Sequence, residues 1–368
     1  MDFKILTRPF FYLVQVILKQ LSRWVLEKRK PVIIAVTGSV AKTSTKEAIW
    51  RVLKERFDVQ KSEGNLNTEI GLPLAILGFK SAPVWFLWPF VLVFALGKAF
   101  WYQLSFVHYP KMLVLEMAAD KPNDIAYLVS FIRPKIGVVT AVGPAHLQTF
   151  HTLERIAQEK GRLVEALPDD GYAILNQADP LVAKMAQKTK AQVLYFVPQD
   201  GDIALAVAKK MAQLFGIRHL PPLPSLKGRL NLLAGLNNSL VIDDTYNANP
   251  LSVAYALKQL KKLAQQHLAK RRIAVLGDML ELGRGAAQWH RQIGRMARSC
   301  ADLLLTTGQL AQEMAEAGGG HFFPDKKALI DYLKKEIRPG DLVLVKASRK
   351  MKFEEIVQAI IKKESKWK

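Results

Sequence analysis

Short apolar runs alternate with longer amphipathic segments along most of the chain. Apolar runs bounded by turn residues predict buried strands, and the amphipathic segments between them predict helices. In the first part of the chain the expected strands fall at residues 32–36, 112–116 and 135–150. A second series begins near Gly228 and contains apolar runs within residues 241–250, 271–283, 302–309 and 341–349. This alternation predicts an α/β protein with parallel sheets.

The division into domains follows from the Pro-rich stretch at residues 220–228, which reads as a linker. A chain of 368 residues is long enough for two or three domains. We expect a basic amphipathic helix over residues 1–30 and a first domain over residues 31–226. We expect a hydrophobic insert at residues 81–108 of that domain, and a second domain over residues 227–368.

Two apolar segments raise the question of membrane contact. Residues 9–26 place apolar side chains on one helical face and are followed by Lys28, Arg29 and Lys30, which fits either a helix at a membrane surface or one packed on the protein's own core. Residues 82–107 are almost wholly apolar and contain Trp85, Trp88 and Trp101. If residues 82–107 crossed a membrane once, the loop at residue 38 and Glu116 would lie on opposite sides of it and could not form one site. Pro89 and Gly97 therefore suggest a broken or hairpin helix lying in the membrane interface, and an apolar subunit contact is the alternative.

Charge and cysteine content narrow the class of partner. Lys and Arg number 53 against 32 acidic residues, a formal net charge of +21 that favours an acidic partner. The sequence shows neither zinc-finger spacing nor a base-stacking motif, so we expect anionic lipid or small phosphates and no nucleic acid. The single cysteine, Cys300, excludes an internal disulfide and fits a reducing cytoplasm.

The segment PVIIAVTGSVAKTST, residues 31–45, has the pattern of a phosphate-binding loop. A strand would lead through a tight loop at Gly38–Ala41 into a helix starting at Lys42, whose unpaired N–H groups attract phosphate. Lys42 would add a positive charge, and the Thr43 hydroxyl could ligate Mg²⁺. Ala41 stands where the full pattern has glycine, and a Cβ there is unfavourable if φ is positive. A plain strand-to-helix turn is the alternative.

Three polar positions follow predicted strands. Gly38, Glu116 and His146 each lie at or beyond the carboxyl end of an apolar run. Ligands of open parallel sheets bind beyond these ends, so we expect the three residues to face one crevice. A buried carboxylate is costly without a partner, which makes Glu116 the strongest of the three candidates.

Eight motifs in order extend this interpretation over almost the whole chain. They are TGSVAKTSTKE, GNLNTEIGLPL, LEMAA, VGPAHL, EKG, DDTYNANP, LGDMLELG and KASR. Together they resemble the Mur ligase family over about residues 31–368. The resemblance implies a P-loop-type central ATP-binding domain with a parallel sheet and a Rossmann-like C-terminal domain. We expect no counterpart of the family's N-terminal UDP-binding domain.

The resemblance also implies a reaction. It implies an ADP-forming ligase in which a substrate carboxylate attacks the γ-phosphate of ATP and an amine displaces phosphate from the acyl phosphate. The acceptor would be a muramyl peptide or a similar acidic carboxylate, and the amine D-alanyl-D-alanine or a related amino acid or dipeptide. The enzyme would be cytoplasmic and peripheral at the inner membrane face. A polyglutamate-type ligase and a degenerate nucleotide-binding scaffold at the membrane are the alternatives.

Residue roles carry over from the family by position. The implied catalytic residues are Lys42, His146 and Lys160. The implied Mg²⁺ ligands are Thr43, Glu116, His146 and Lys160, the last as a carbamate. The implied nucleotide-binding residues are Gly38, Ser39, Ala41, Lys42, Thr43, Ser44, Arg229, Asp244, Asn247 and Asn249. The implied substrate residues of the C-terminal domain are Lys346, Ser348 and Arg349.

Overall fold

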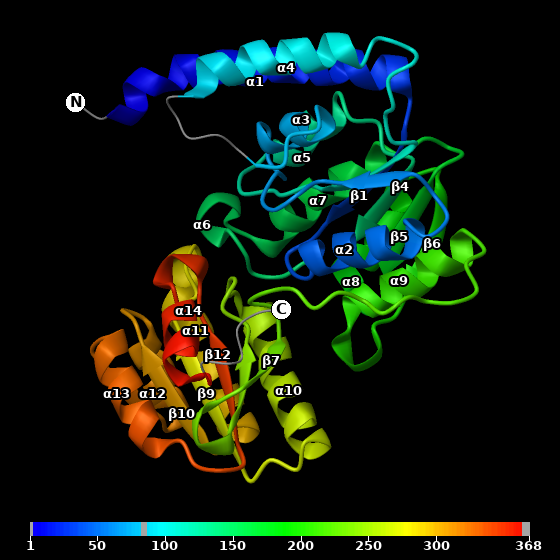
Figure 1. Cartoon of the computed structure of the whole chain (residues 1–368). Coiled ribbons are helices and arrows are strands. Elements are labelled where there is room, and N and C mark those ends of the chain that lie inside the picture. Colours follow the sequence, from blue (N-terminus) through cyan, green and yellow to red (C-terminus); the bar gives the residue numbers. More distant parts are fainter. Residues whose placement is uncertain (1–2, 82–86, 363–368) are drawn as a thin grey trace. The chain divides into compact units, whose positions relative to one another are not determined.

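The computed structural model describes residues 3–81 and 87–362, and the chain divides into two compact units (Figure 1). Unit 1 comprises Met1–Val142 and Thr152–Pro224, and unit 2 comprises Gly143–His151 and Ser225–Lys368. The sequence predicted the boundary between the two domains at residues 226/227, and in the structure the two units divide at residues 224/225. The N-terminal helix is part of unit 1, and a short segment around His146 groups with unit 2.

Unit 1 is built on a six-stranded parallel sheet. Its strands are β1 (Val32–Thr37), β2 (Val59–Lys61), β3 (Met112–Glu116), β4 (Ile136–Val139), β5 (Tyr172–Asn176) and β6 (Gln192–Phe196), in the order β2-β3-β1-β4-β5-β6. Central strands of such a sheet are covered on both faces, which explains their continuous apolar sequence. Val36 of β1 pairs with Glu116 of β3. The loop after β1 and the carboxylate that ends β3 therefore leave the sheet at neighbouring points.

Helices cover both faces of this sheet. On one face α2 (Lys42–Leu53) and α9 (Ile203–Leu214) share a buried apolar cluster with the strands. On the other face, Leu163 of α7 (Leu153–Glu165) lies over Gly137 of β4. The remaining short helices of the unit are α3 (Gly71–Ile76), α5 (Asp124–Val129) and α8 (Pro180–Ala183).

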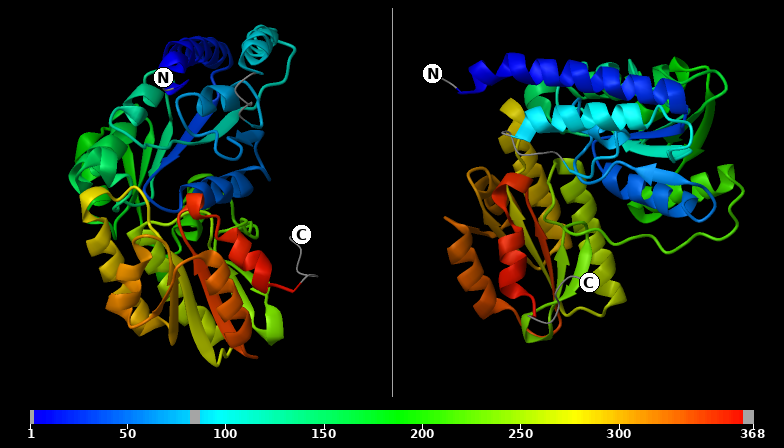
Figure 2. Two further views of the ribbon diagram at one scale, coloured as in Figure 1. Left: turned by 90° about the vertical axis from the view of Figure 1, so that its left-hand side faces the viewer. Right: turned by 45° about the horizontal axis from the view of Figure 1, so that its top comes forward.

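A pair of helices forms an additional layer of unit 1. The 27-residue α1 (Phe3–Arg29) lies beside α4 (Trp88–Trp101), with α3 next to them (Figures 1 and 2). Val14, Leu18 and Val25 of α1 are buried in a cluster with Trp88, Ala95 and Ala99 of α4 and residues of α3. Within residues 3–81 and 87–362, none of the helices combines the length and the apolar character that a membrane span requires.

The structure corrects one expectation for this layer. The apolar segment does not form a broken or hairpin helix at Pro89 and Gly97, because α4 runs without interruption from Trp88 to Trp101. Pro89 occupies the first turn, where the missing N–H costs no hydrogen bond. Residues 82–86 of the insert, which include Trp85, lie outside the described residues.

Unit 2 repeats the α/β plan. Its strands are β7 (Asn231–Ala234), β8 (Leu240–Asp243), β9 (Arg271–Gly277), β10 (Leu303–Thr307), β11 (His321–Phe323) and β12 (Asp341–Lys346), in the order β11-β10-β9-β12-β8-β7. All pairs are parallel except β7 with β8. One apolar cluster contains α10 (Pro250–Gln266), α11 (Ala286–Cys300) and α12 (Ala311–Gly318). A second contains α13 (Lys326–Glu336) and α14 (Glu354–Ile360). The prediction of an α/β protein with parallel sheets is confirmed.

Candidate active site

The loop after β1 has a backbone that only particular residues can adopt. Gly38 has φ 149°, and a Cβ built there would lie 1.8 Å from Thr140 Oγ1. The loop is held from β4, because Thr140 Oγ1 donates to the carbonyl of Val40 at 2.7 Å and the Ser39 N–H donates to the carbonyl of Ala141 at 2.8 Å. Glycine is therefore required at position 38 for steric reasons.

Ala41 precedes α2 in a left-handed conformation, with φ 59° and ψ 9°. The Cβ at this position is strained, as expected where the usual glycine is replaced. Ala41 has no side-chain acceptor for the first N–H groups of α2, and these groups form the positive end of the helix dipole. Lys42 follows, and its Nζ donates to the carbonyl of Gly38 at 2.9 Å. The local geometry is that of an anion-binding turn.

Glu116 presents one satisfied and one unsatisfied carboxylate oxygen. Its Oε1 accepts a hydrogen bond from Asn67 Nδ2 at 3.0 Å, and its main-chain N–H donates to Ser62 Oγ at 3.2 Å. Its Oε2 is buried and accepts no hydrogen bond from any residue that the structure describes. The ammonium of Lys46 lies 3.9 Å from Oε2. A buried oxygen of this kind fits a hard cation such as Mg²⁺.

Lys46 was not singled out from the sequence. It is fully buried on α2, and its Nζ donates to the carbonyl of Ser62 at 2.6 Å. Glu47 Oε1 lies 3.5 Å from the same nitrogen and Glu116 Oε2 3.9 Å. The buried cation thus connects the helix that starts at Lys42 with the carboxylate that ends β3.

Lys160 lies on α7 with only 3% of its surface exposed. Burial lowers its pKa to about 7, and the positive charge of Lys42 contributes in the same direction. Asp120 and Glu159 oppose the shift. Both carboxylate oxygens of Glu159 accept N–H bonds at the start of α5, from Asn123 at 2.9 Å and Ile125 at 2.7 Å. The charge of Lys42 thus acts on Lys160, and Glu159 caps the start of α5.

The donor set of unit 1 can be tested for its fit to Mg²⁺. In the part of the chain that the structure describes, His, Cys, Asp and Glu side chains form no group of three able to hold a metal ion. Glu116 contributes an unsatisfied oxygen, Thr43 contributes a hydroxyl in the first turn of α2, and a carbamate on Lys160 would contribute further oxygens. Oxygen ligands of this kind, completed by phosphate oxygens and water, suit Mg²⁺. The residues therefore fit the metal that the sequence predicts.

His146 lies in the segment that groups with unit 2. Its Nδ1 is 2.7 Å from Glu281 Oε2, and this interaction lowers the pKa of the Glu281 carboxyl. The next short helix, α6 (Leu147–Phe150), is held by the bond from the Gln148 N–H to the carbonyl of Glu281 at 3.1 Å. Glu281 was not among the predicted residues. That His146 shares a crevice with Gly38 and Glu116 stays a prediction.

Unit 2 gathers several predicted residues beyond the ends of β8 and β12. Lys346 is buried, and its Nζ donates to Asp244 Oδ2 at 2.6 Å and to the carbonyl of Asn247 at 2.8 Å. Burial raises the pKa of Asp244, while Lys346 and then Arg229 oppose the shift. The two sequence motifs DDTYNANP and KASR are thus joined by a buried ion pair.

The ring of Tyr246, which was not predicted as a site residue, lies near two predicted arginines. The guanidinium of Arg229 lies 4.1 Å from the centroid of Tyr246, and that of Arg349 lies 5.9 Å away. Cations over an aromatic face are attracted by its quadrupole. Tyr246 lies within the quoted motif DDTYNANP, which was the available signal. The ring and both arginines form a candidate surface for a planar or anionic ligand.

Two predicted site residues have structural contacts that account for them. Asn249 caps α10 in a reciprocal capping box with Ser252. Ser348 Oγ accepts from the Leu280 N–H at 2.9 Å and donates to the carbonyl of Ala248 at 3.3 Å. The fully buried His290 accepts from the Met279 N–H at 3.0 Å. These contacts shape the loops around Asp244 and Lys346.

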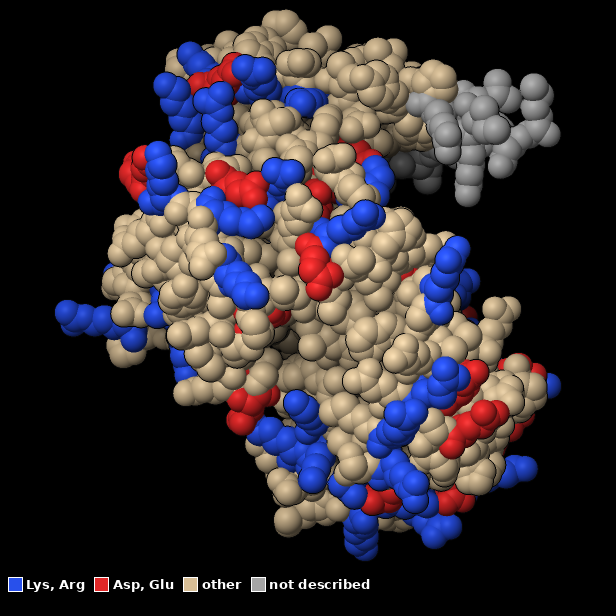
Figure 3. Space-filling view, turned by 180° about the vertical axis from the view of Figure 1, so that it is seen from behind, with Lys and Arg blue, Asp and Glu red and all other residues tan. Residues whose placement is uncertain are grey.

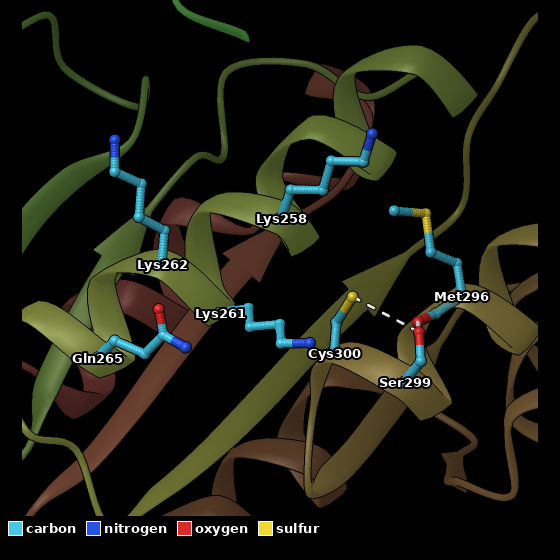
Figure 4. A pocket seen from close by; sticks show the side chains of 7 residues that line it. All are labelled: Lys258, Lys261, Lys262, Gln265, Met296, Ser299 and Cys300. Carbon is cyan, nitrogen blue, oxygen red and sulfur yellow. Dashed lines mark hydrogen bonds between the residues drawn. The ribbon is translucent and has the colours of Figure 1, made fainter. Parts of the chain in front are cut away.

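A hollow of about 420 Å³ lies elsewhere on unit 2, between α10 and α11 (Figure 4). Its lining is Lys258, Lys261, Lys262, Gln265, Met296, Ser299 and Cys300. The lysine ammonium groups point in different directions and do not converge on one point (Figure 4). The hollow contains none of the predicted site residues, and we assign it no role.

The fold and the phosphate-binding turn indicate a nucleotide-binding α/β protein, and comparisons with known proteins specify the family. Residues 102–223 match the Mur ligase middle domain, and residues 228–349 match the glutamate ligase domain of Mur ligases. The chain belongs to the Mur ligase family. It is an enzyme that forms an amide between a carboxylate and an amine with ATP.

Individual relatives agree with this assignment. The chain is 29% identical over 390 residues to UDP-N-acetylmuramoyl-tripeptide–D-alanyl-D-alanine ligase of Bacillus subtilis, with 94% of this chain and 79% of that protein covered. It is 31% identical over 399 residues to the ligase of the same name from Mycobacterium tuberculosis, with 89% and 72% covered.

Solved structures show the same fold. MurF ligase from Thermotoga maritima in complex with ADP has a TM-score of 0.76 at 25% identity, covering 93% of this chain and 82% of that one. FolC of Escherichia coli, also with ADP, has a TM-score of 0.64 at 16% identity, covering 93% of each chain, which shows the fold alone.

Proposed function

We propose that this enzyme adds D-alanyl-D-alanine to the peptide carboxylate of a muramyl tripeptide, with ATP and Mg²⁺. The names of the relatives supply the substrates. The observation that carries the chemistry is the buried Oε2 of Glu116, which has no hydrogen-bond donor among the described residues and ends the strand beside the phosphate-binding loop. A polyglutamate-type reaction is less well supported, because FolC resembles the chain only in fold.

Unit 1 would supply the nucleotide chemistry. The loop Gly38–Ala41 and the first turn of α2, including Ser39 and Ser44, would bind phosphate oxygens through their N–H groups, and Lys42 would add a positive charge. Glu116 and Thr43 would hold Mg²⁺, which neutralises crowded phosphate and carboxylate oxygens. The resemblance implies a further role at the metal for His146, which belongs to unit 2. These roles reduce repulsion between the attacking carboxylate and ATP.

Lys160 would act as a carbamate. Burial lowers the pKa of Lys160 to about 7, so a much larger fraction of its amine is neutral at pH 7 than for an ordinary lysine. The neutral Nζ attacks the carbon of CO₂, an N–C bond forms, and one nitrogen-bound proton leaves to solvent. The product is an anion with two oxygens in place of a cation, and it suits Mg²⁺.

Unit 2 would handle the nucleotide and the incoming amine. Arg229, Asp244, Asn247 and Asn249 lie on or beside the loop that we assign to nucleotide contacts. Lys346 ends β12, Ser348 and Arg349 follow it, and the three residues would contribute to the dipeptide site. The ion pair between Lys346 and Asp244 links these two groups of residues, so displacement of either partner would alter both.

We also propose that the enzyme works in the cytoplasm, held at the inner face of the cytoplasmic membrane through α1 and α4. ATP is its energy source, and the free buried Cys300 is compatible with a reducing compartment.

The test of the proposed function is a ligation assay read by mass spectrometry. The full chain is incubated with ATP, Mg²⁺, UDP-muramyl tripeptide and D-alanyl-D-alanine, with glutamate and acidic acceptors in parallel. We expect the dipeptide adduct together with ADP, and loss of both with Lys42→Ala. ATP binding without amine-dependent ADP formation would instead support a nucleotide-binding scaffold and contradict the proposal.

A further inference from the structure

The layer formed by α1 and α4 exposes an unusual amount of apolar surface. On α4, Phe90, Val93, Phe94, Phe100 and Trp101 are 55–74% exposed. Further exposed apolar residues of the layer are Phe10, Tyr12, Leu13, Val16 and Trp24 on α1, Leu87 and Leu96 at or on α4, and Leu104 and Phe106 after it. We call this set the α1–α4 surface. Exposed apolar side chains concentrated on two adjacent helices favour an interaction site.

Part of the apolar character of α4 serves its packing, since Val91 and Leu92 pack against the buried cluster and Phe100 contacts Trp24. Only Trp88, Ala95 and Ala99 of this helix are buried. Its single charged residue, Lys98, uses its ammonium locally, donating to the carbonyl of Gly78 at 2.9 Å and lying 4.8 Å from the ring centroid of Phe79. The outward face of α4 therefore presents aromatic and aliphatic side chains without a charge.

Basic residues lie at one end of this layer. Lys28 and Lys30 are exposed at the end of α1, and exposed Lys111 is adjacent because its carbonyl accepts the Val32 N–H at 2.9 Å. Figure 3 shows lysine and arginine side chains, with acidic side chains among them, at one end of a mostly uncharged region. Arg29 connects the end of α1 to the segment after α4, because its guanidinium donates to the carbonyls of Tyr102 and Leu104 at 2.7 Å each.

The layer is firmly attached to the rest of unit 1. Ser22 Oγ donates to the carbonyl of Pro73 in α3 at 3.2 Å. Lys19 Nζ donates to Ser130 Oγ at 2.8 Å and lies 4.5 Å from the ring centroid of Tyr127 in α5. Whatever binds the α1–α4 surface is thereby fixed in orientation relative to the phosphate-binding loop of the same unit.

We propose that the α1–α4 surface docks onto an anionic lipid bilayer. The aromatic and aliphatic side chains enter the boundary between headgroups and acyl chains, where aromatic rings are favoured, and Lys28, Lys30 and Lys111 contact anionic headgroups. The net charge of +21 favours an anionic surface and opposes pairing with a second, equally charged copy. The inference rests on the membrane location proposed for the enzyme and is independent of its ligation chemistry.

The experiment measures partitioning of the full chain onto phosphatidylcholine vesicles with and without about 30% phosphatidylglycerol, a fraction chosen within the anionic range of cytoplasmic leaflets. We expect binding to the anionic vesicles that weakens as salt is raised. The double variant Phe94→Ser/Trp101→Ser should bind the vesicles at least about tenfold less. Each substitution removes a large apolar side chain that the bilayer would otherwise bury. The matched control is Leu268→Ser, which removes a leucine that is 87% exposed on unit 2.

Two further measurements keep the test decisive. The double variant Lys28→Glu/Lys30→Glu should lose the preference for anionic vesicles. Its ATP binding should be unchanged, which would show that the variant is folded. Quenching of tryptophan fluorescence by brominated lipid should fall with Trp101→Phe and not with Trp289→Phe.

Equal partitioning of the wild type and the Phe94/Trp101 variant would overturn the proposal. A dimer that forms without lipid and is lost in that variant, with no lipid binding by either, would show that a second copy is the occupant. Soluble ligation activity is measured in parallel, so loss of docking with intact ligation separates this inference from the proposed function.

Discussion

Unit 1 and unit 2 each bury a lysine beside their sheets, and the two lysines have opposite surroundings. Lys346 has 2% of its surface exposed and forms an ion pair with Asp244 at 2.6 Å. Lys160 has 3% exposed, and its pKa falls to about 7 because burial and nearby Lys42 outweigh the attraction of Asp120 and Glu159. Burial alone does not decide what a lysine does. A close carboxylate makes it a structural cation, and a desolvated site beside another cation makes it a reactive amine.

The largest effect is expected from removal of the reactive amine. Lys160→Ala should lower the ligation rate by about a thousandfold, comparable to loss of a key electrostatic group in an active site. Lys160→Arg should be equally impaired, because a guanidinium does not form the carbamate. Added short carboxylic acids should restore part of the activity of Lys160→Ala only. Steady-state rates with saturating ATP provide the measurement, and near-normal activity of Lys160→Arg would contradict the carbamate role.

The structural cation should instead affect stability. Lys346→Met leaves the Asp244 carboxylate buried without its partner and should lower the free energy of unfolding by about 3–5 kcal/mol. Asp244→Asn/Lys346→Met removes both charges and should cost less than the single change. Urea unfolding of both variants, with Lys160→Met as the comparison, measures the difference. If Lys160→Met were as destabilising as Lys346→Met, the contrast between the two lysines would be lost.

The pH dependence of stability has a defined sign at Lys160. Its pKa is about 7 in the folded chain and near 10.4 when unfolded, so the unfolded chain binds more protons between these values. The free energy of unfolding should therefore rise with pH from about 7 to about 10, relative to Lys160→Met. The urea midpoints of the wild type and of Lys160→Met, measured as a function of pH, test this prediction. If the two curves ran parallel, the Lys160 pKa would not be lowered.

The smallest expected effect is a change in stability at Ala41, in the loop that precedes Lys42. The charge of Lys42 helps to lower the pKa of Lys160. Ala41 has φ 59°, so Ala41→Gly should stabilise the protein by about 1 kcal/mol and leave ATP affinity equal or higher. Thermal unfolding and ATP titration give both quantities. A matched change at Ala48, which is buried in the middle of α2, should destabilise instead. Destabilisation by Ala41→Gly would mean that the left-handed turn is not strained.

Much of unit 1 could be predicted because local rules and sheet topology agree. The apolar runs at residues 32–36 and 112–116 are strands, and their adjacent parallel ends place Glu116 next to the loop after β1. The run at 135–150 was expected to be one strand, but it contains only the short β4, a loop and α6. The strain at Ala41 was likewise foreseeable from the glycine that it replaces. These inferences need only neighbouring residues and the general geometry of parallel sheets.

Other features depend on packing between distant segments and were missed for that reason. Burial of Lys46 is not visible from its sequence, because charged residues normally occupy exposed helix positions. His146 contacts Glu281, which lies far away in the sequence, so local sequence rules could not predict this pair. Pro89 suggested a break in the helix, yet it occupies the first turn, where proline is tolerated.

The most direct test of the account is carbon-13 NMR of the protein equilibrated with labelled bicarbonate at pH 8. The account predicts a carbamate resonance in the wild type and in Lys346→Arg, and its loss in Lys160→Arg. A wild type without this resonance, or a Lys160→Arg protein that retains it, would contradict the assignment of Lys160 as the reactive amine.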